Sequence, residues 1–333
     1  MDSSQNSKIL YIKREVLLFI LMNIISCCFV LAQKETQLLN TVPLSIGESV
    51  EFQSKVLNEN RILNIYLPNE YSKDTSKKYP VIYLLDGSID EDFIHIAGLV
   101  QFGSFSWINM IPESIVVGIS NVDRKRDFTF PTNNQKDKKD FPTTGKSQSF
   151  IDFIKKELQP LIDEQYKTDS DKTLIGQSLG GLLATEILFK APDLFDNYII
   201  TSPSLWWDDE SLLNEEPFSY TSKKSIYIGV GKEGEIMEGV AKKLYDKLRL
   251  RKHESTSLYF ELFEEQNHGD ALHLAVYDAF EKIFKAKKGL AVVTAQNGIC
   301  GGCRTSMSAQ KTMQVEKGEL VTCSSCGRLM IRR

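Results

Sequence analysis

The sequence predicts an α/β protein with a mostly parallel central sheet, followed by a small second domain at the C-terminal end. Two apolar runs, "YPVIYLLDG" and "SIVVGIS", have no polar alternation, which is typical of strands buried on both faces of a parallel sheet. From about residue 80 to 286 such runs alternate with segments of helical periodicity. A doubly wound sheet follows from this alternation, and its ligand chemistry is expected at the carboxyl ends of the strands.

The elements are expected in a definite order. Residues 48–68 hold two strand-like runs joined by a hairpin turn at Asn58-Glu59-Asn60, and residues 132–147 form an exposed polar, lysine-rich loop. A helix follows, beginning near Gln148 or Ser149. The remaining strands are expected in "KTLIGQ", "FDNYIITSPS", "KKSIYIGVG" and "STSLYFELFE", and the remaining helices in "LLATEILFKA", "EIMEGVAKKLYDKLRLR" and "ALHLAVYDAFEKIFKA".

Composition narrows the class of protein. The chain has 333 residues, 42% of them hydrophobic, and a net charge of −4. That length allows one large or two modest domains with a sizeable core. The weak acidity gives no strong signal of nucleic-acid binding.

The N-terminal segment has the pattern of a secretory signal peptide over residues 1–32. Lys8, Lys13 and Arg14 precede an apolar run from Val16 to Ala32. Cleavage there would make the protein secreted or periplasmic, and its contact with a membrane would be limited to the signal. Two alternatives are an uncleaved membrane anchor and a lipoprotein, because "IISC" resembles a lipobox.

The string "TLIGQSLGG" places Ser178 between glycines at the junction of a predicted strand and a predicted helix. A nucleophilic serine needs a sharp turn that lifts it from the backbone, and Gly176 and Gly180 relieve the crowding of such a turn. The N–H of Leu179, at the start of the helix, would face a developing oxyanion. The alternative is a strand–helix turn in which Ser178 only caps the helix.

Chain order selects the histidine. In this architecture the order is serine, acid, histidine. His268 lies in the polar loop "EEQNHGD" between the last strand and the last helix, where a general base is expected. By contrast, His95 precedes the serine, His253 lies among charged residues and His273 falls inside the last helix. The alternative for His268 is a solvent-exposed loop histidine.

The acid is expected after the strand "SIYIGVG", as Glu233 or, second, Glu235. Both could instead only decorate the first turn of the next helix, where carboxylates are favoured. The second oxyanion donor is expected near Gly87 or Ser88, after the strand "VIYLL".

These motifs together resemble the putative-esterase family of α/β-hydrolases, which includes esterase D, feruloyl and acetyl esterases and ferric-enterobactin esterases. The resemblance rests on "YPVIYLLDG", "NVDRKRDFTFP", "IGQSLGGLLATEIL", "SPSLWW" and "NHGD", over roughly residues 45–286. It implies an α/β-hydrolase fold with Ser178 as nucleophile and His268 as base. It also implies that Asp86-Gly87 marks the oxyanion strand and that Arg126 and Trp206 line the substrate side.

Several residues that carry this resemblance depart from the family pattern or have an alternative interpretation. Siderophore-type members can lack a well-placed acid, and "DFTFP" departs from the family's usual "DFTP" by the insertion of Phe130. Arg124–Arg126 could equally be a solvated charge cluster, and Trp206-Trp207 could be core packing.

The last segment, residues 289–333, carries the pairs "CGGC" and "CSSC". Two C-x-x-C knuckles at this spacing predict a structural zinc site formed by Cys300, Cys303, Cys323 and Cys326. A domain of this size needs such a staple, and the segment resembles a C4-type zinc ribbon, a kind thought to contact nucleic acid or protein. Two disulfides are the alternative in an exported chain.

The sequence therefore predicts a signal peptide at 1–32, an esterase domain at 33–288 and a zinc ribbon at 289–333. The expected activity is hydrolysis of a small ester through an acyl-enzyme, with no cofactor in catalysis. Siderophore-type, feruloyl and acetyl esters all suit the motifs. Other hypotheses are a non-catalytic scaffold whose ribbon binds nucleic acid or protein, and acyl transfer on the same triad. Nothing in the sequence indicates an oligomeric state.

Overall fold

A computed structural model describes most of the chain. The described residues are 3–31, 40–69, 71, 76–284, 292–296, 298–301, 306–323 and 329–332. The chain divides into two compact units, Met1–Ser45 and Ile46–Arg333, and each is considered by itself.

The first unit contains one long helix, α1 (Ser3–Leu31). Among the described residues, no helix combines the length and the apolar character required to cross a membrane. The signal peptide at 1–32 remains a prediction.

The second unit opens with an antiparallel hairpin of β1 (Glu48–Ser54) and β2 (Glu59–Tyr66). The turn occupies residues 55–58, a few residues earlier than expected, and Asn58 adopts a left-handed conformation with φ 54°. Asparagine tolerates this region better than most residues, which explains why the chain reverses there.

The hairpin joins an eight-stranded sheet with the order β1-β2-β4-β3-β5-β6-β7-β8. From β4 to β8 every neighbouring pair is parallel. The strands are β3 (Tyr79–Leu84), β4 (Ile115–Ile119), β5 (Thr168–Gln177), β6 (Asn197–Thr201), β7 (Lys224–Gly231) and β8 (Thr256–Phe263). Strands β4, β6 and β7 are buried at every position, so the predicted α/β fold with a mostly parallel sheet is confirmed.

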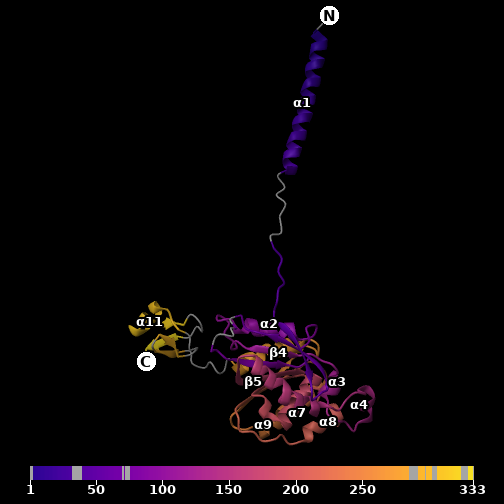
Figure 1. The fold of residues 1–333 in the computed structure, drawn as a ribbon, viewed down its shortest axis with the longest axis vertical. Coiled ribbons are helices and arrows are strands. Elements are labelled where there is room, and N and C mark those ends of the chain that lie inside the picture. Colours follow the sequence, from indigo (N-terminus) through magenta and orange to yellow (C-terminus); the bar gives the residue numbers. More distant parts are fainter. Residues whose placement is uncertain are drawn as a thin grey trace. The chain divides into compact units, whose positions relative to one another are not determined.

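Helices cover both faces of this sheet, as Figure 1 shows for α2 on one side and α7 and α9 on the other. One face packs against α2 (Phe93–Ser104) and α10 (Ala271–Phe284). The other packs against α3 (Arg124–Phe128), α5 (Ser147–Phe153), α6 (Gln159–Gln165), α7 (Leu179–Lys190) and α9 (Glu235–Arg251). The short helices α4 (Gln135–Asp140) and α8 (Trp207–Asn214) lie in connections.

The helix expected from about residue 149 forms in three parts. A π-helical turn, Ile154–Leu158, separates α5 from α6, and Pro160 stands at the start of α6. Proline has no N–H for the helical ladder, so a local change of hydrogen-bond pattern beside it is expected.

The C-terminal segment forms a second, four-stranded sheet with the order β10-β9-β12-β11. Its elements are β9 (Val292–Gln296), β10 (Ile299–Cys300), α11 (Ala309–Glu316), β11 (Val321–Thr322) and β12 (Leu329–Arg332). Its small core contains the buried Cys300 and Cys323 beside Val315 and Met330. The expected domain boundary near 288 lies outside the described residues.

Candidate active site

Ser178 lies at a tight turn between β5 and α7. Its backbone is strained, with φ 59° and ψ −119°. A Cβ on Gly176 would come within 2.4 Å of the Gly180 carbonyl oxygen, and one on Gly181 within 2.9 Å of the Pro203 Cα. Only glycine allows these approaches, so the sequence around Ser178 is what permits the turn.

Glu233 follows β7 and meets His268, which lies in the loop after β8. The His268 Nδ1 and Glu233 Oε2 atoms are 2.5 Å apart, and the Glu233 side chain is 2% exposed. Its other oxygen, Oε1, accepts hydrogen bonds from the Ser202 hydroxyl and from the Gly231 N–H. Glu235 is exposed at the first position of α9.

The environment of Glu233 favours its charged form. Burial opposes ionisation, but hydrogen bonds from His268, Ser202 and the backbone N–H of Gly231 outweigh it, so the pKa of Glu233 lies below its ordinary value. A carboxylate that stays ionised can orient a neighbouring imidazole and stabilise its protonated form.

An open pocket of about 540 Å³ brings together four of the predicted residues, Ser178, Glu233, His268 and Trp206. Its lining comprises Ser178, Ser204, Trp206, Lys232, Glu233, Met237, Asn267 and His268. Among the described residues, the side-chain partner of the Ser178 hydroxyl is the Ser204 hydroxyl, at 3.3 Å, rather than His268. Catalytic hydrogen bonds are often incomplete without substrate.

Two further contacts hold the pocket's loops. The Gln177 side-chain amide donates to the His268 carbonyl at 2.6 Å, and the Ser204 N–H donates to the Ser178 carbonyl at 3.0 Å. Sequence reasoning missed Ser202, Ser204 and Gln177 as site residues. The adjacency of the "SPS" segment to the predicted strand end was the signal that could have found the two serines.

The two expected oxyanion donors differ in their availability. Leu179 is the first residue of α7, where a backbone N–H has no acceptor within the helix. In contrast, the Gly87 N–H donates to the Ile119 carbonyl at 3.0 Å, so it is already used within the sheet. The structure thus argues against Gly87 and leaves Ser88, whose N–H has only a long contact, 3.3 Å, to a Glu91 carboxylate oxygen.

Arg126 does not line the pocket, contrary to expectation. Its guanidinium lies 2.6 Å from a Glu59 carboxylate oxygen and 2.7 Å from an Asp127 oxygen. Asp127 also pairs with the fully buried Arg61. Arg126 therefore belongs to an ionic network that ties α3 to the hairpin.

Arg124, two residues earlier, is the arginine beside the site. It binds the Asp86 carboxylate through two hydrogen bonds, of 2.6 and 2.8 Å, and donates to the Gln177 carbonyl at 3.2 Å. Asn121 also donates to Asp86, at 2.7 Å. These contacts join the end of β3 to the residue directly before Ser178.

The two tryptophans have different environments. Trp206 lines the pocket, whereas Trp207 is fully buried and donates its indole N–H to the Phe130 carbonyl at 3.0 Å. Phe130 is itself buried, so the inserted residue of "DFTFP" packs in the interior.

The predicted metal ligands are only partly described. Cys300 ends β10 and Cys323 directly follows β11, and both side chains are buried. Cys303 and Cys326 lie outside the described residues. Within the described ranges, no group of three or more histidine, cysteine or carboxylate side chains could hold a metal ion.

A mostly parallel sheet with a serine turn, a buried glutamate and a histidine at the carboxyl ends of its strands defines the α/β-hydrolase class. Residues 54–271 match the family described as Putative esterase, and the chain belongs to that family. Residues 299–330 match the C4-type zinc ribbon domain.

Individual proteins show the same relationship. The chain is 30% identical over 259 residues to the ferri-bacillibactin esterase BesA of Bacillus subtilis (strain 168). The aligned region covers 71% of this chain and 88% of that protein. An IroE-like serine hydrolase from Shewanella oneidensis has a similar structure, with TM-score 0.64, 29% identity and coverage of 72% of this chain and 81% of that one. The BES protein from Bacillus cereus has TM-score 0.64 and 28% identity, with coverage of 75% and 99%. The family match and the relative BesA confirm the expected class of activity: the chain is a carboxylic-ester hydrolase.

Proposed function

We propose that the chain is a serine esterase in which Ser178 is the nucleophile, His268 the general base and Glu233 the acid of the triad. The observation that supports this most is the His268–Glu233 contact at 2.5 Å in the pocket that Ser178 also lines. A buried, ionised carboxylate against a histidine suits general-base chemistry beside a serine on a strained turn.

In the proposed mechanism, the Ser178 oxygen attacks the ester carbonyl carbon and its proton passes to the imidazole of His268. Glu233 stabilises the resulting imidazolium. The oxyanion accepts hydrogen bonds from the N–H of Leu179 and of Ser88. The carbon–oxygen bond to the alcohol then breaks, and the alcohol leaves with the proton from His268. Water, deprotonated by His268, attacks the acyl-enzyme and releases the carboxylic acid and free Ser178.

We propose a siderophore-type ester as the substrate. The pocket is open and large, and it presents an aromatic ring from Trp206, a thioether from Met237 and the ammonium group of Lys232, which also pairs with Glu238 at 3.1 Å. Such a lining suits a bulky ester with aromatic rings and negative charge. Relatives with this named activity include BesA and, 38% identical over 82 residues, a siderophore triacetylfusarinine C esterase of Aspergillus fumigatus.

The decisive experiment compares the purified wild-type chain with Ser178→Ala on p-nitrophenyl acetate, methyl ferulate and a catecholate trilactone siderophore. We expect Ser178→Ala to lose nearly all turnover, and the trilactone to have the highest kcat/KM. Ser104→Ala, at the end of α2 and outside the pocket, is the matched control and should keep full activity. Equal rates for wild type and Ser178→Ala would refute the nucleophile.

We also propose that Cys300, Cys303, Cys323 and Cys326 hold one structural zinc ion. Two of these cysteines are buried in one small core, which suits inward-facing thiolate ligands. A bound zinc would crosslink the ribbon and take no part in ester hydrolysis. Elemental analysis should find one zinc per chain, lost in Cys323→Ala, whereas two disulfides and no zinc would support the alternative.

The support for export is the sequence pattern of residues 1–32. We propose cleavage after Ala32 and a secreted or periplasmic mature protein. Mass spectrometry of the protein expressed in its host should find Gln33 as the mature N-terminus. An intact N-terminal segment would contradict cleavage.

A further inference from the structure

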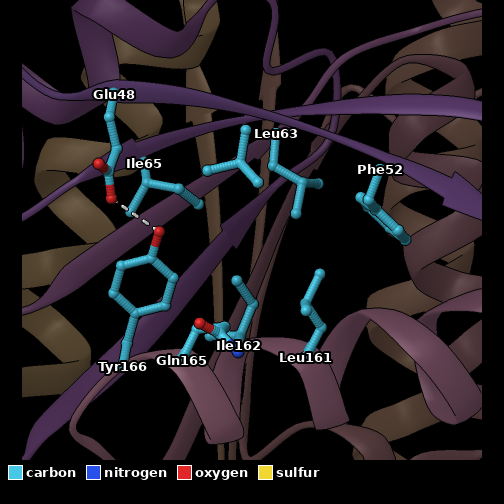
Figure 2. Close-up of a pocket in the computed structure, with 9 residues that line it drawn as sticks. Glu48, Phe52, Leu63, Ile65, Leu161, Ile162, Gln165 and Tyr166 are labelled. Carbon is cyan, nitrogen blue, oxygen red and sulfur yellow. Dashed lines mark hydrogen bonds between the residues drawn. The ribbon is translucent and has the colours of Figure 1, made fainter.

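A second pocket, of about 240 Å³, lies at the edge of the large sheet, and none of its described lining residues belongs to the candidate active site. It lies between the β1–β2 hairpin and α6 (Figure 2). Its lining residues are Glu48, Val50, Phe52, Leu63, Ile65, Leu161, Ile162, Gln165 and Tyr166.

Most of this lining is apolar. Figure 2 shows Leu63 and Ile65 of the hairpin facing Leu161 and Ile162 of α6 across an open space. Leu63 and Ile65 are fully buried and form the floor beneath the pocket, whereas Val50, Phe52 and Leu161 are partly exposed along it. Protein interiors are normally close-packed, and apolar cavities of about 150 Å³ already bind a molecule of benzene. This pocket is therefore large enough for one ring.

Polar groups gather at one side of the pocket. The Tyr166 hydroxyl donates to a Glu48 carboxylate oxygen at 2.8 Å, and Gln165 lies next to them (Figure 2). Burial, and then the hydrogen bond to Glu48, raise the pKa of Tyr166, which keeps its hydroxyl protonated and donating. Among the described residues, Tyr166 is the donor to this carboxylate, which leaves acceptor capacity for a ligand.

We propose that this pocket binds a small uncharged aromatic molecule, of about one ring and with a single hydroxyl group, such as a phenol. The ring lies against the partly exposed side chains of Val50, Phe52 and Leu161, and the ligand hydroxyl donates to Glu48. The bound molecule holds the edge hairpin against α6. This site is independent of ester hydrolysis, so its test does not depend on turnover.

The experiment titrates phenol and benzene into the full chain and follows the methyl resonances of Leu63, Ile65, Leu161 and Ile162. Both probes should give saturable shifts at these methyls. Phenol should bind about tenfold more tightly, because a hydrogen bond to a carboxylate adds affinity that benzene lacks. Glu48→Ala should remove this difference and keep benzene binding.

Leu161→Trp fills the pocket and should abolish binding of both probes. Leu250→Trp is the matched control, because Leu250 is 78% exposed on α9, outside the pocket. If Leu161→Trp does not fold, Val50→Phe fills the same space from the opposite wall. The proposal is overturned if neither probe gives saturable shifts at these methyls, if the filled variant binds like wild type, or if phenol and benzene bind equally.

Discussion

Ser202 illustrates how one buried hydroxyl can act on the candidate triad. It is fully buried at the end of β6, its φ is 44°, and its hydroxyl donates to the same carboxylate whose other oxygen contacts His268. A non-glycine residue in this conformation is costly unless its contacts compensate. We therefore predict that Ser202 positions Glu233 for its contact with His268.

We expect Ser202→Ala to raise the pKa of Glu233, since one of the hydrogen bonds that lower it is lost. The lowered pKa of Glu233 stabilises the folded chain above pH 4.5, its ordinary value, and this stabilisation is lost as the pH falls through the folded pKa. In Ser202→Ala acid unfolding should begin at higher pH, and kcat/KM at neutral pH should fall about tenfold.

Ser202→Gly serves as the control for backbone strain, because glycine accepts a positive φ without cost. If the hydroxyl is what matters, both variants should show the same shift of acid unfolding and the same fall in kcat/KM. Unchanged acid unfolding and unchanged kcat/KM in both variants would remove the positioning role.

Substitutions of Arg124 and Arg126 by lysine should differ in their effects on activity. Arg124→Lys loses the two-pronged bond to Asp86 and the contact to the Gln177 carbonyl, so the turn before Ser178 loses a support. We expect kcat/KM to fall about tenfold, the effect of one charge-assisted hydrogen bond. Steady-state kinetics on p-nitrophenyl acetate measure this.

Arg126→Lys is the matched variant. It weakens the network with Glu59 and Asp127 and should lower the melting temperature while kcat/KM stays unchanged. The opposite pattern, with Arg126→Lys losing activity and Arg124→Lys keeping it, would restore the role that the sequence suggested for Arg126.

Chain order and strand ends selected Ser178 and His268 and placed Glu233 ahead of Glu235, and the structure gathers Ser178, His268 and Glu233 in one pocket. The roles expected for Gly87 as oxyanion donor and for Arg126 as pocket residue are not supported, because each depends on the hydrogen-bond partner that the group has in the folded chain. The Gly87 N–H is taken by a neighbouring strand, and Arg126 by carboxylates on other elements. Sequence spacing does not reveal such competing partners.

At the scale of elements, periodicity predicted the strands of the large sheet and the helices α5, α6, α7, α9 and α10, but not the short helices α3, α4 and α8. Helix α2 was not predicted, since glycines 98 and 103 lower helix propensity within it. Its burial against α10 and the sheet compensates for that weakness. The hairpin turn was placed slightly late, because turn position depends on which residue takes the left-handed conformation.

Glycines in two helices should respond in opposite ways to substitution by alanine. Gly181→Ala in α7 puts a methyl group 2.9 Å from the Pro203 Cα, so α7 or the segment after β6 must shift. We expect a loss of about 1–3 kcal/mol in the free energy of unfolding. Gly239→Ala in α9 meets nothing within 4 Å and should gain about 0.5–1 kcal/mol. Urea denaturation of the two variants measures both effects, and equal stabilities would contradict the proposed close packing at Gly181.

For the whole molecule, the two sheets have separate hydrophobic cores. The large sheet contributes one core on each face, and the C-terminal sheet has its own, built around Cys300 and Cys323. The esterase family match ends at residue 271, before the zinc-ribbon match begins at 299. Stability of the ribbon and activity of the esterase should thus be separable.

Zinc removal tests this separation. With the proposed four-cysteine zinc site, treating the full chain with a chelator that removes zinc should make the C-terminal segment sensitive to protease, because its small core would lose the crosslink between its cysteine pairs. Turnover of p-nitrophenyl acetate should stay unchanged, since none of the described residues of that segment lines the pocket around Ser178. Cys323→Ala should reproduce both results without any reagent, which excludes side reactions of the chelating treatment. A parallel loss of zinc and of turnover would instead mean that the ribbon supports the catalytic domain, and the two cores would have to be regarded as one cooperative unit.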